Sequence, residues 1–280
     1  MRYVTFSADG RTRWGWVDGD RVRALDHLHP SLKAAIEAGA LAADPLRSGD
    51  GAAFALTDIT FLPLIPDPGK ILCIGLNYED HRRETGRAVV SNPTIFTRFA
   101  DSQTGHLSAI LRPRESAMLD YEGELAIVIG KGGRRIPAAT ALDHVAGYSC
   151  YNDGSVRDWQ AHTIQFTPGK NFPGTGAFGP WLVTPDMFGP PGGQTIQTRL
   201  NGTVMQRATL ADMIFPIGRL IEYCSTFTPL APGDVIVTGT PGGVGVKRNP
   251  QIFMQPGDRV EVEIDGIGVL ANAIAQEGAE

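Results

Sequence analysis

Three acidic residues from two separate segments have the types and spacing of a metal site. Glu122 and Glu124 begin an apolar run that ends at Gly130, a pattern typical of a buried strand. Residues i and i+2 of a strand point to the same face, so the two carboxylates converge. Like charges this close need a cation, a proton or an arginine to neutralise them. Asp153, which follows another short apolar stretch, can bring a third carboxylate to the same place.

The donor set indicates a hard divalent cation. Three carboxylates without clustered His or Cys favour Mg²⁺ or Mn²⁺ over Zn²⁺. A Glu-x-Glu pair is a weak signal by itself, because Glu261 and Glu263 repeat it in a run that alternates polar and apolar residues. That second pair is interpreted as the solvent face of a half-buried strand. The additional cluster around Asp153 is what favours a metal site at the first pair.

A histidine and a glutamate could form a general base. His81 and Glu84 are three residues apart in a predicted short helix, which Asn77 would cap and Gly86 would end. A carboxylate that orients a histidine ring and stabilises its charged form is a common arrangement for proton transfer. The competing interpretation is an exposed, charged helix with an incidental histidine.

Two glycine-rich segments have patterns that occur in ligand sites. Residues 174–179 match G-x-G-x-x-G, but Pro173 and Pro180 flank them and no helix follows a strand there, so dinucleotide binding is rejected. Residues 239–245 form an amide-rich loop that could hold an anion or simply make a tight turn. No Gly-Lys-Ser/Thr follows, so this loop is not a nucleotide-binding P-loop.

The elements expected to position these residues form a β-rich α/β fold, which 34 Gly and 20 Pro also favour. Residues 1–65 are predicted to be a small α+β domain, joined by a Pro-rich linker to a main domain over residues 66–280. The expected strands cover 2–6, 13–17, 22–24, 70–75, 93–99, 125–130, 146–151, 181–184, 197–200, 203–206, 235–238 and 259–264. Helices are expected over 31–39, 138–145, 157–160 and 213–227.

Composition excludes several classes of protein. The chain has 280 residues, a net charge of -5 and no basic tract, so a nucleic-acid partner is not expected. Its apolar runs are too short to span a membrane. Three widely spaced cysteines, Cys73, Cys150 and Cys224, fit reduced thiols, and residues 1–10 lack a signal-peptide pattern. A cytoplasmic location is therefore expected.

An ordered set of motifs resembles the fumarylacetoacetate hydrolase superfamily. The match covers roughly residues 65–275, and residues 1–65 match only loosely. The motifs, in chain order, are Asn77-Tyr78-x-x-His81-x-x-Glu84, Asp120-Tyr121-Glu122-x-Glu124-Leu125, Asn152-Asp153-x-Ser155-x-Arg157-Asp158-x-Gln160, Gly169-Lys170, Gly179-Pro180-Trp181 and Gly239-Thr240-Pro241.

The resemblance implies a fold, a metal and an assembly. The fold would be a mixed β-sandwich roll, usually found as a homodimer. The metal would be Mg²⁺ or Mn²⁺, bound by Glu122, Glu124 and Asp153. The family also implies a small-molecule keto acid as substrate.

Catalytic roles follow from the same resemblance. His81 and Glu84 would activate water on a segment that can act as a lid, and Lys170 would stabilise the developing enolate or oxyanion. Two positions depart from the family, since Arg98 stands where many members have Lys, and Gly154 where a larger residue is common. The residues expected to contact substrate are Arg157, Gln160, Gly239, Thr240 and Arg98.

The expected reaction is hydrolysis of a C–C bond in a 2,4-diketo acid, an acylpyruvate such as fumarylpyruvate. Water activated by His81 would attack the C4 carbonyl, and pyruvate would leave as an enolate stabilised by the metal and Lys170. The alternatives are oxaloacetate decarboxylation or keto–enol tautomerisation, hydration of a 2-oxo-alkenoate, and a catalytically inactive metal-binding homologue. The setting expected from the resemblance is catabolism of aromatic or sugar-derived keto acids.

Overall fold

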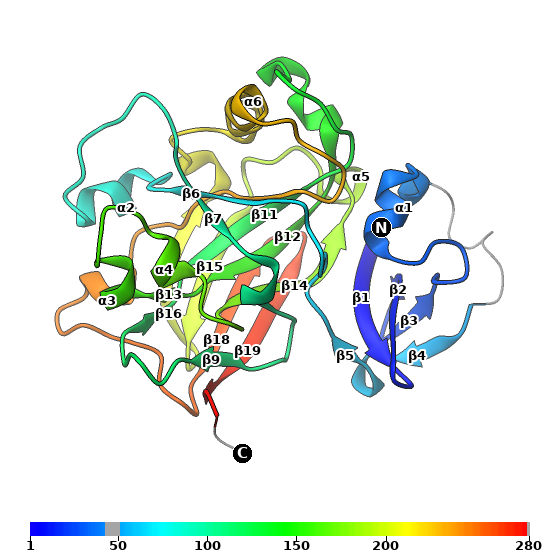
Figure 1. The fold of residues 1–280 in the computed structure, drawn as a ribbon, viewed down its shortest axis with the longest axis horizontal. Coiled ribbons are helices and arrows are strands. Elements are labelled where there is room, and N and C mark those ends of the chain that lie inside the picture. The colour runs from blue at the N-terminus through cyan, green and yellow to red at the C-terminus, as the bar shows by residue number, and fades with distance from the viewer. Residues whose placement is uncertain (43–50, 279–280) are drawn as a thin grey trace.

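A computed structural model describes residues 1–42 and 51–278, and two β-sheets form most of it (Figure 1). The larger sheet contains, in spatial order, β4 (Ala53–Ala55), β3 (Arg21–Ala24), β2 (Arg11–Asp18), β1 (Arg2–Ala8), β14 (Gly176–Val183), β12 (Val145–Asp153), β11 (Gly123–Ile129), β17 (Val235–Val237), β6 (Ile71–Gly75) and β7 (Thr94–Arg98). β5 (Thr60–Phe61) pairs with β1, and β8 (Gln103–Thr104) pairs with β14.

The second sheet packs against the middle of the first. Its strands are β16 (Thr203–Thr209), β15 (Thr195–Leu200), β18 (Arg259–Ile264), β19 (Gly268–Gln276) and β9 (Ile110–Arg112). A separate ribbon pairs β10 (Leu119–Asp120) with β13 (Ser155–Val156). The expected β-rich α/β architecture is confirmed.

The helices are short and lie around the sheets (Figure 1). They are α1 (Leu32–Glu37), α2 (Glu79–Glu84), α3 (Arg157–Gln160), α4 (Thr167–Lys170), α5 (Pro185–Phe188) and α6 (Ile217–Phe227). In addition, 3₁₀ helices cover Ala40–Ala42, Leu56–Asp58, Ala100–Ser102, Ala138–His144, Leu210–Asp212 and Gly245–Lys247. The helix expected over 138–145 is therefore of the 3₁₀ type, and α6 begins only after Pro216, which is its N-cap.

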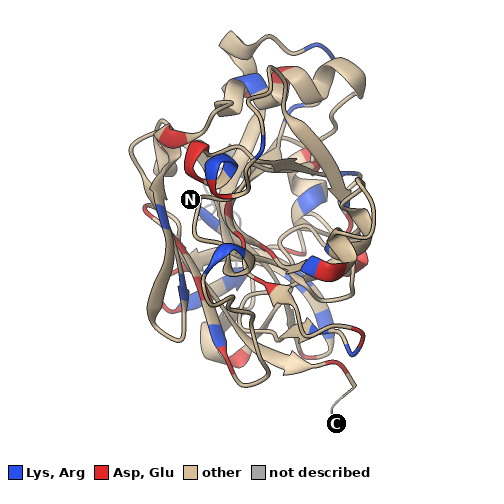
Figure 2. Cartoon of the chain, turned by 90° about the vertical axis from the view of Figure 1, so that its left-hand side faces the viewer, with Lys and Arg blue, Asp and Glu red and all other residues tan. Residues whose placement is uncertain are grey.

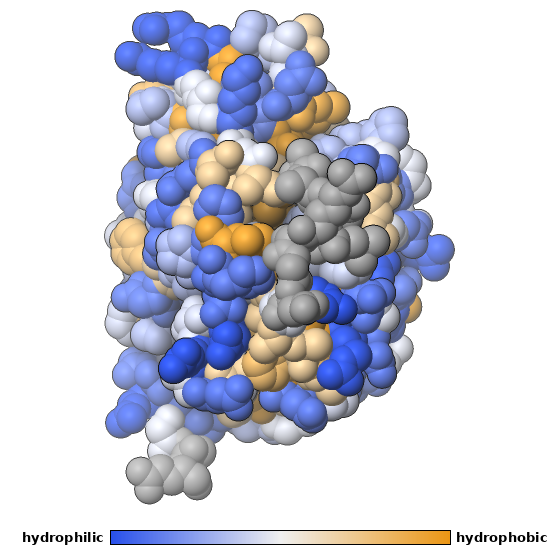
Figure 3. Space-filling view, turned by 90° about the vertical axis from the view of Figure 1, so that its right-hand side faces the viewer, coloured by the Kyte–Doolittle hydropathy of each residue, from blue (hydrophilic) through white to orange (hydrophobic). Residues whose placement is uncertain are grey.

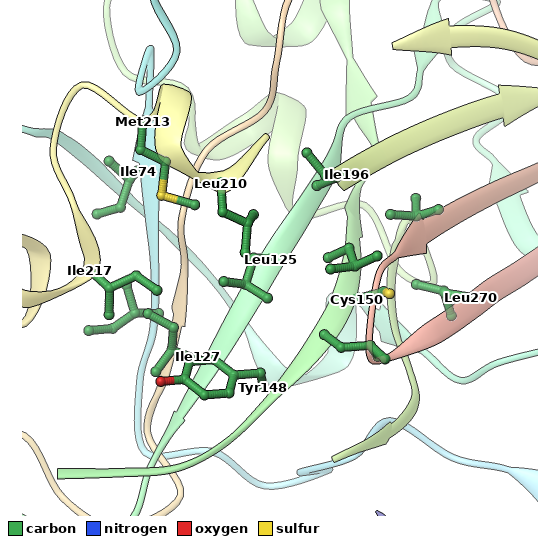
Figure 4. Packing of buried hydrophobic residues seen from close by; sticks show 14 of the residues in the cluster. Ile74, Leu125, Ile127, Tyr148, Cys150, Ile196, Leu210, Met213, Ile217 and Leu270 are labelled. Carbon is green, nitrogen blue, oxygen red and sulfur yellow. The ribbon is translucent and has the colours of Figure 1, made fainter. Parts of the chain in front are cut away.

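Strand β11 is buried along its whole length, as its apolar sequence predicts. Leu125 and Ile127 point into the core between the two sheets, where they join Ile196 and Met213 (Figure 4). The alternate residues of β11 belong to the core on the opposite face of the large sheet. A strand with two buried faces is held rigidly, so it can carry charged residues at its end in a fixed place.

The N-terminal unit continues the large sheet. Tyr3 of β1 is opposite Leu182 of β14, so backbone pairing joins the unit to the main sheet at this edge. Within the unit, Ser31 caps α1 by accepting a hydrogen bond from the amide of Ala34 at 3.1 Å, as expected. Its outer face is mostly hydrophilic, with small apolar patches (Figure 3).

On the side of α2 and α3, basic and acidic residues are interspersed along the chain (Figure 2). Among residues 1–42 and 51–278, no helix is long and apolar enough to cross a membrane.

Candidate active site and metal centre

Strand pairing brings the three predicted acidic residues together. β11 and β12 are antiparallel, and Gly123 lies opposite Asn152, so the start of β11 meets the end of β12. One carboxylate oxygen each of Glu122, Glu124 and Asp153 lies within 4.8 Å of the others, and all three side chains are buried. The predicted convergence is therefore confirmed, and an all-oxygen donor set of this kind suits Mg²⁺ or Mn²⁺.

Two of these carboxylates have basic partners. Lys170 Nζ lies 2.6 Å from Glu122 Oε2 and 2.5 Å from Asp153 Oδ2. Arg157 Nη1 lies 2.7 Å from Glu122 Oε1, and Arg98 Nη1 lies 2.6 Å from Asp153 Oδ1. Burial opposes the charged form of Glu122, but Lys170 and Arg157 outweigh it and lower the pKa of that carboxyl. In turn, burial disfavours the ammonium of Lys170, but Asp153 and Glu122 raise its pKa.

Glu124 is the exception. It accepts a hydrogen bond from the amide of Gly239 at 2.5 Å, and no ion pair joins it to a basic side chain in the described part of the chain. Burial raises the pKa of Glu124 well above its ordinary range, and the nearby Asp153 and Glu122 raise it further. A divalent cation would neutralise this remaining carboxylate, so the three acidic residues fit a metal ion.

The acidic cluster opens into a cavity of about 710 Å³. The polar and charged residues that line it include His81, Arg87, Glu122, Glu124, Arg157, Gln160, Lys170, Thr240 and Lys247. Its apolar lining includes Ile74, Leu76, Val90, Phe96, Ile164, Phe166, Val244 and Val246. Lys170 also lies 4.7 Å from the centre of the Phe96 ring, a cation–π contact that helps fix the ammonium. A largely apolar cavity with a few convergent charges is typical of a small-molecule site.

The predicted His–Glu pair forms at the wall of this cavity. His81 Nδ1 lies 2.7 Å from Glu84 Oε1, and Glu84 Oε2 accepts a hydrogen bond from the amide of Gly243 at 2.9 Å. Burial opposes the charged form of Glu84, but these two hydrogen bonds lower its pKa. Because Nδ1 is engaged with Glu84, Nε2 is the ring nitrogen left for a substrate.

Asn77 does not cap α2 as predicted. The N-cap is Tyr78, which makes no side-chain capping bond. The buried amide of Asn77 instead donates to the carbonyl oxygens of Phe215 and Thr238, at 3.1 and 2.7 Å. Its side-chain oxygen accepts from the amide of Phe215 at 2.8 Å. Asn77 thus fixes the start of the α2 segment to β17, and the local sequence does not show these distant partners.

Three of the predicted substrate-binding residues line the cavity: Arg157, Gln160 and Thr240. Arg157 is well placed, because its Nη2 is buried and has no hydrogen-bond partner among the described residues. The hydroxyl of Thr240 donates to the carbonyl of Gly123 at 3.0 Å and accepts from Gln206 at 2.7 Å. Its proton is therefore already in use, and any role for Thr240 toward a substrate is as an acceptor or a packing group.

Arg98 does not line the cavity, so the structure gives no support to the predicted contact with substrate. Its side chain is completely buried and lies outside the cavity lining. It bonds Asp153, the carbonyl of Gly154 at 3.1 Å and the hydroxyl of Thr175 at 2.7 Å. Gly239 is also outside the lining, and its amide serves Glu124. Both residues therefore bind the acidic cluster itself and do not line the cavity. This arrangement depends on packing between distant strands.

Sequence reasoning gave no role to Asp120, although it lies in the motif that contains Glu122. It is fully buried and pairs with Arg157, with Oδ2 2.8 Å from Nε. Asp120 lies in the short strand β10, and its local sequence gives no sign of a pairing with Arg157, which is 37 residues away. Only the antiparallel contact of β10 with β13 reveals it.

Comparison with protein-family models supports the resemblance. Residues 70–275 match the fumarylacetoacetate (FAA) hydrolase C-terminal family, and residues 1–63 match a family described as Rv2993c-like, N-terminal. Among curated proteins, oxaloacetate tautomerase FAHD2A, mitochondrial, of Bos taurus is 43% identical over 220 residues, which are 78% of this chain and 70% of that protein.

Solved structures share the fold across the whole chain. A fumarylacetoacetate hydrolase from psychrophilic Exiguobacterium antarcticum has a TM-score of 0.88 and 35% identity, over 99% of this chain and 100% of that one. A maleylpyruvate hydrolase from Sphingobium sp. SYK-6, in complex with manganese (II) ion and pyruvate, has a TM-score of 0.83 and 26% identity over 99% of both chains.

Proposed function

This chain belongs to the fumarylacetoacetate hydrolase family, and we propose that it is a divalent-metal-dependent enzyme that interconverts the keto and enol forms of oxaloacetate. The proposal rests chiefly on one observation: three buried carboxylates converge, and two of them, Glu122 and Glu124, line one cavity together with His81 and Lys170. The 43% identity to a protein named oxaloacetate tautomerase favours this reaction among those that such a site can perform.

Keto–enol conversion needs two proton movements and stabilisation of an anion. A proton leaves C3 of oxaloacetate, negative charge develops on the C2 oxygen, and a proton is then added to that oxygen; the reverse reaction retraces these steps. A Mg²⁺ or Mn²⁺ bound by Glu122, Glu124 and Asp153 would act as a Lewis acid that favours the enolate charge.

The protein's own side chains can carry the remaining work. His81 is placed to take or return the proton at its Nε2, because Glu84 holds Nδ1 and stabilises the charged ring. The ammonium of Lys170 would stabilise negative charge on the C2 oxygen. Arg157 Nη2, which has no partner among the described residues, would bind a substrate carboxylate.

Hydrolysis of an acylpyruvate is the second candidate. The His81–Glu84 pair at 2.7 Å suits activation of water, and the maleylpyruvate hydrolase that shares the fold is named for such a reaction. The sequence motifs favour this reaction and leave tautomerisation among the alternatives. The curated relative supports the alternative more strongly, so tautomerisation takes first place.

The test follows the enol form of oxaloacetate by its ultraviolet absorbance after dilution into buffer. The protein with Mn²⁺ should speed the decay of the enol well beyond Mn²⁺ alone, and EDTA should abolish the effect. Parallel assays measure pyruvate release from oxaloacetate, acetylpyruvate and maleylpyruvate.

Each outcome has a distinct meaning. Enol decay without pyruvate release supports the tautomerase. EDTA-sensitive pyruvate release from an acylpyruvate, without faster enol decay, supports the hydrolase, and pyruvate from oxaloacetate alone indicates a decarboxylase. If no assay detects activity, hydration of a 2-oxo-alkenoate or an inactive metal-binding homologue is favoured. The homodimer, the cytoplasmic location and the catabolic setting stay predictions.

A further inference from the structure

We propose that Asp120 is a positioning residue that fixes both halves of the active site at once: Arg157 on one side, and the His81–Glu84 pair on the other. The inference deepens the proposed function and rests on it for its kinetic readout. It assigns Asp120 no contact with substrate or metal. Its basis is the set of hydrogen bonds that this one carboxylate makes to two separate segments.

The carboxylate of Asp120 is fully buried and accepts four hydrogen bonds. Oδ1 accepts from the amides of Tyr121 and Gly245, both at 2.9 Å. Oδ2 accepts from the amide of Val246 at 2.9 Å and from Arg157 Nε at 2.8 Å. Each of these bonds fixes the direction of its donor.

The first connection runs to Arg157, which lines the cavity. Asp120 holds Arg157 at Nε, while Glu122 and Gln160 hold Nη1 at 2.7 and 2.8 Å. With these contacts the planar guanidinium has one orientation, and Nη2 is the nitrogen left over. Loss of the Asp120 contact would leave Arg157 tied only through Nη1, about which the group can turn. The same guanidinium touches Glu122, a candidate metal ligand, so its rotation would also disturb that carboxylate.

The second connection runs through the loop beside the cavity. The amides of Gly245 and Val246 bind Asp120, and two residues earlier the amide of Gly243 binds Glu84, which holds His81. The loop fits tightly against the carboxylate. A Cβ on Gly245 would lie 2.6 Å from Asp120 Oδ1 and 1.8 Å from the carbonyl oxygen of Ile252. Release of the loop from Asp120 would therefore free the donor that holds Glu84.

Asp234 provides a matched control. It is also a buried aspartate that pairs with a basic side chain and a backbone amide. Lys70 Nζ lies at 2.9 Å and the amide of Ala231 at 2.8 Å. It lies outside the cavity lining, at the end of β17 opposite to Gly239. Asp→Asn at either position should cost stability, but only the change at Asp120 should alter the site.

The experiment compares Asp120→Asn and Asp234→Asn in the full chain. Hydrogen exchange measured by mass spectrometry should rise by about tenfold or more in residues 243–247 and 79–84 of the Asp120 variant, because the loop bonds open more often. The Asp234 variant should show no change in these two segments. KM for oxaloacetate should rise by about tenfold to a hundredfold in the Asp120 variant, which is the effect of losing hydrogen bonds between charged groups.

A second variant separates the two connections and remains informative if Asp120→Asn does not fold. Val246→Pro removes one amide donor to Asp120 while leaving Arg157 paired, and Gly245 before it tolerates a following proline. Because Val246 itself lines the cavity, hydrogen exchange is the readout for this variant. Exchange should rise in residues 79–84 through the Gly243–Glu84 contact, and unchanged exchange there would overturn the second connection.

The results distinguish failure of this inference from failure of the proposed function. Faster exchange confined to residues 118–121 in Asp120→Asn, with 243–247 and 79–84 unchanged, would overturn the positioning role whatever the enzyme's substrate. Equal effects of the two Asp→Asn changes on KM would also overturn it, since Asp120 would then be only a structural residue. If the protein lacks tautomerase activity, the exchange pattern alone decides.

Discussion

Replacing Glu124 by glutamine should stabilise the metal-free protein and abolish its stabilisation by metal. Glu124 is 2% exposed, and its pKa is raised by burial and by Asp153 and Glu122. The folded chain therefore holds this proton more tightly than the unfolded chain does. The resulting contribution to stability is fully present below the unfolded pKa and is lost as the pH rises toward the folded pKa.

The magnitude follows from the difference between the ordinary pKa and the working pH. The ordinary value is 4.5. Each pKa unit corresponds to about 1.4 kcal/mol. Keeping Glu124 protonated in the folded chain at pH 7 therefore lowers the free energy of unfolding by up to about 3 kcal/mol. Glutamine at position 124 is neutral without a proton, so Glu124→Gln should recover much of this free energy at pH 7. The gain should shrink toward pH 5.

The assay is urea unfolding of EDTA-treated protein at pH 7 and pH 5, followed by melting curves with and without Mn²⁺. Wild type should gain stability from Mn²⁺, and the Glu124→Gln variant should not. Glu261→Gln is a matched control, because Glu261 belongs to the other Glu-x-Glu pair and binds Arg199 at 2.9 Å. It should respond to Mn²⁺ like wild type. A Glu124→Gln variant that is no more stable than wild type at pH 7, and that still responds fully to Mn²⁺, would refute the reasoning.

Three further variants test separate parts of the site. His81→Ala should keep Mn²⁺ affinity in calorimetric titration but lose about 10²- to 10⁴-fold in kcat, and equal losses in both would contradict a role in proton transfer alone. Arg98→Leu should lower the free energy of unfolding by about 3 to 5 kcal/mol because it leaves Asp153 without its buried arginine, whereas a normal urea midpoint would show that this pair is unimportant. Asn77→Ala should cost about 2 to 4 kcal/mol by the same measurement, because it strands two carbonyl groups and an amide, and a loss below 1 kcal/mol would indicate that water replaces it.

Local patterns were enough to predict most of the longer strands and much of the candidate site, but not β19 (Gly268–Gln276), β9 (Ile110–Arg112) or the first half of β14 (Gly176–Val183). The apolar run after Glu124 predicts β11, and the alternation of residues 259–264 correctly places Glu261 and Glu263 away from the site, where Arg199 pairs with both. The convergence of Asp153 with the first pair was also expected. It requires only that two neighbouring buried strands pair in antiparallel register.

Long-range packing explains what sequence reasoning missed. Arg98 lies at the end of a strand near the site. Whether its side chain faces the cavity or pairs with Asp153 depends on how β7, β12 and β14 are arranged in the sheet. Asn77 has the residue type of a helix cap, yet its partners Phe215 and Thr238 are more than a hundred residues away. The role of Asp120 likewise appears only once Arg157 and the loop at 243–246 are placed beside it.

Titration of Mn²⁺ into EDTA-treated protein while the decay of enol oxaloacetate is recorded tests the central claim most directly. The account predicts no protein-dependent acceleration without metal and a rate that saturates at one Mn²⁺ per chain, with Glu124→Gln failing to respond over the same range. Acceleration that persists in EDTA, or that Glu124→Gln shows at the same Mn²⁺ concentrations as wild type, would contradict a metal-dependent site built from the three buried carboxylates.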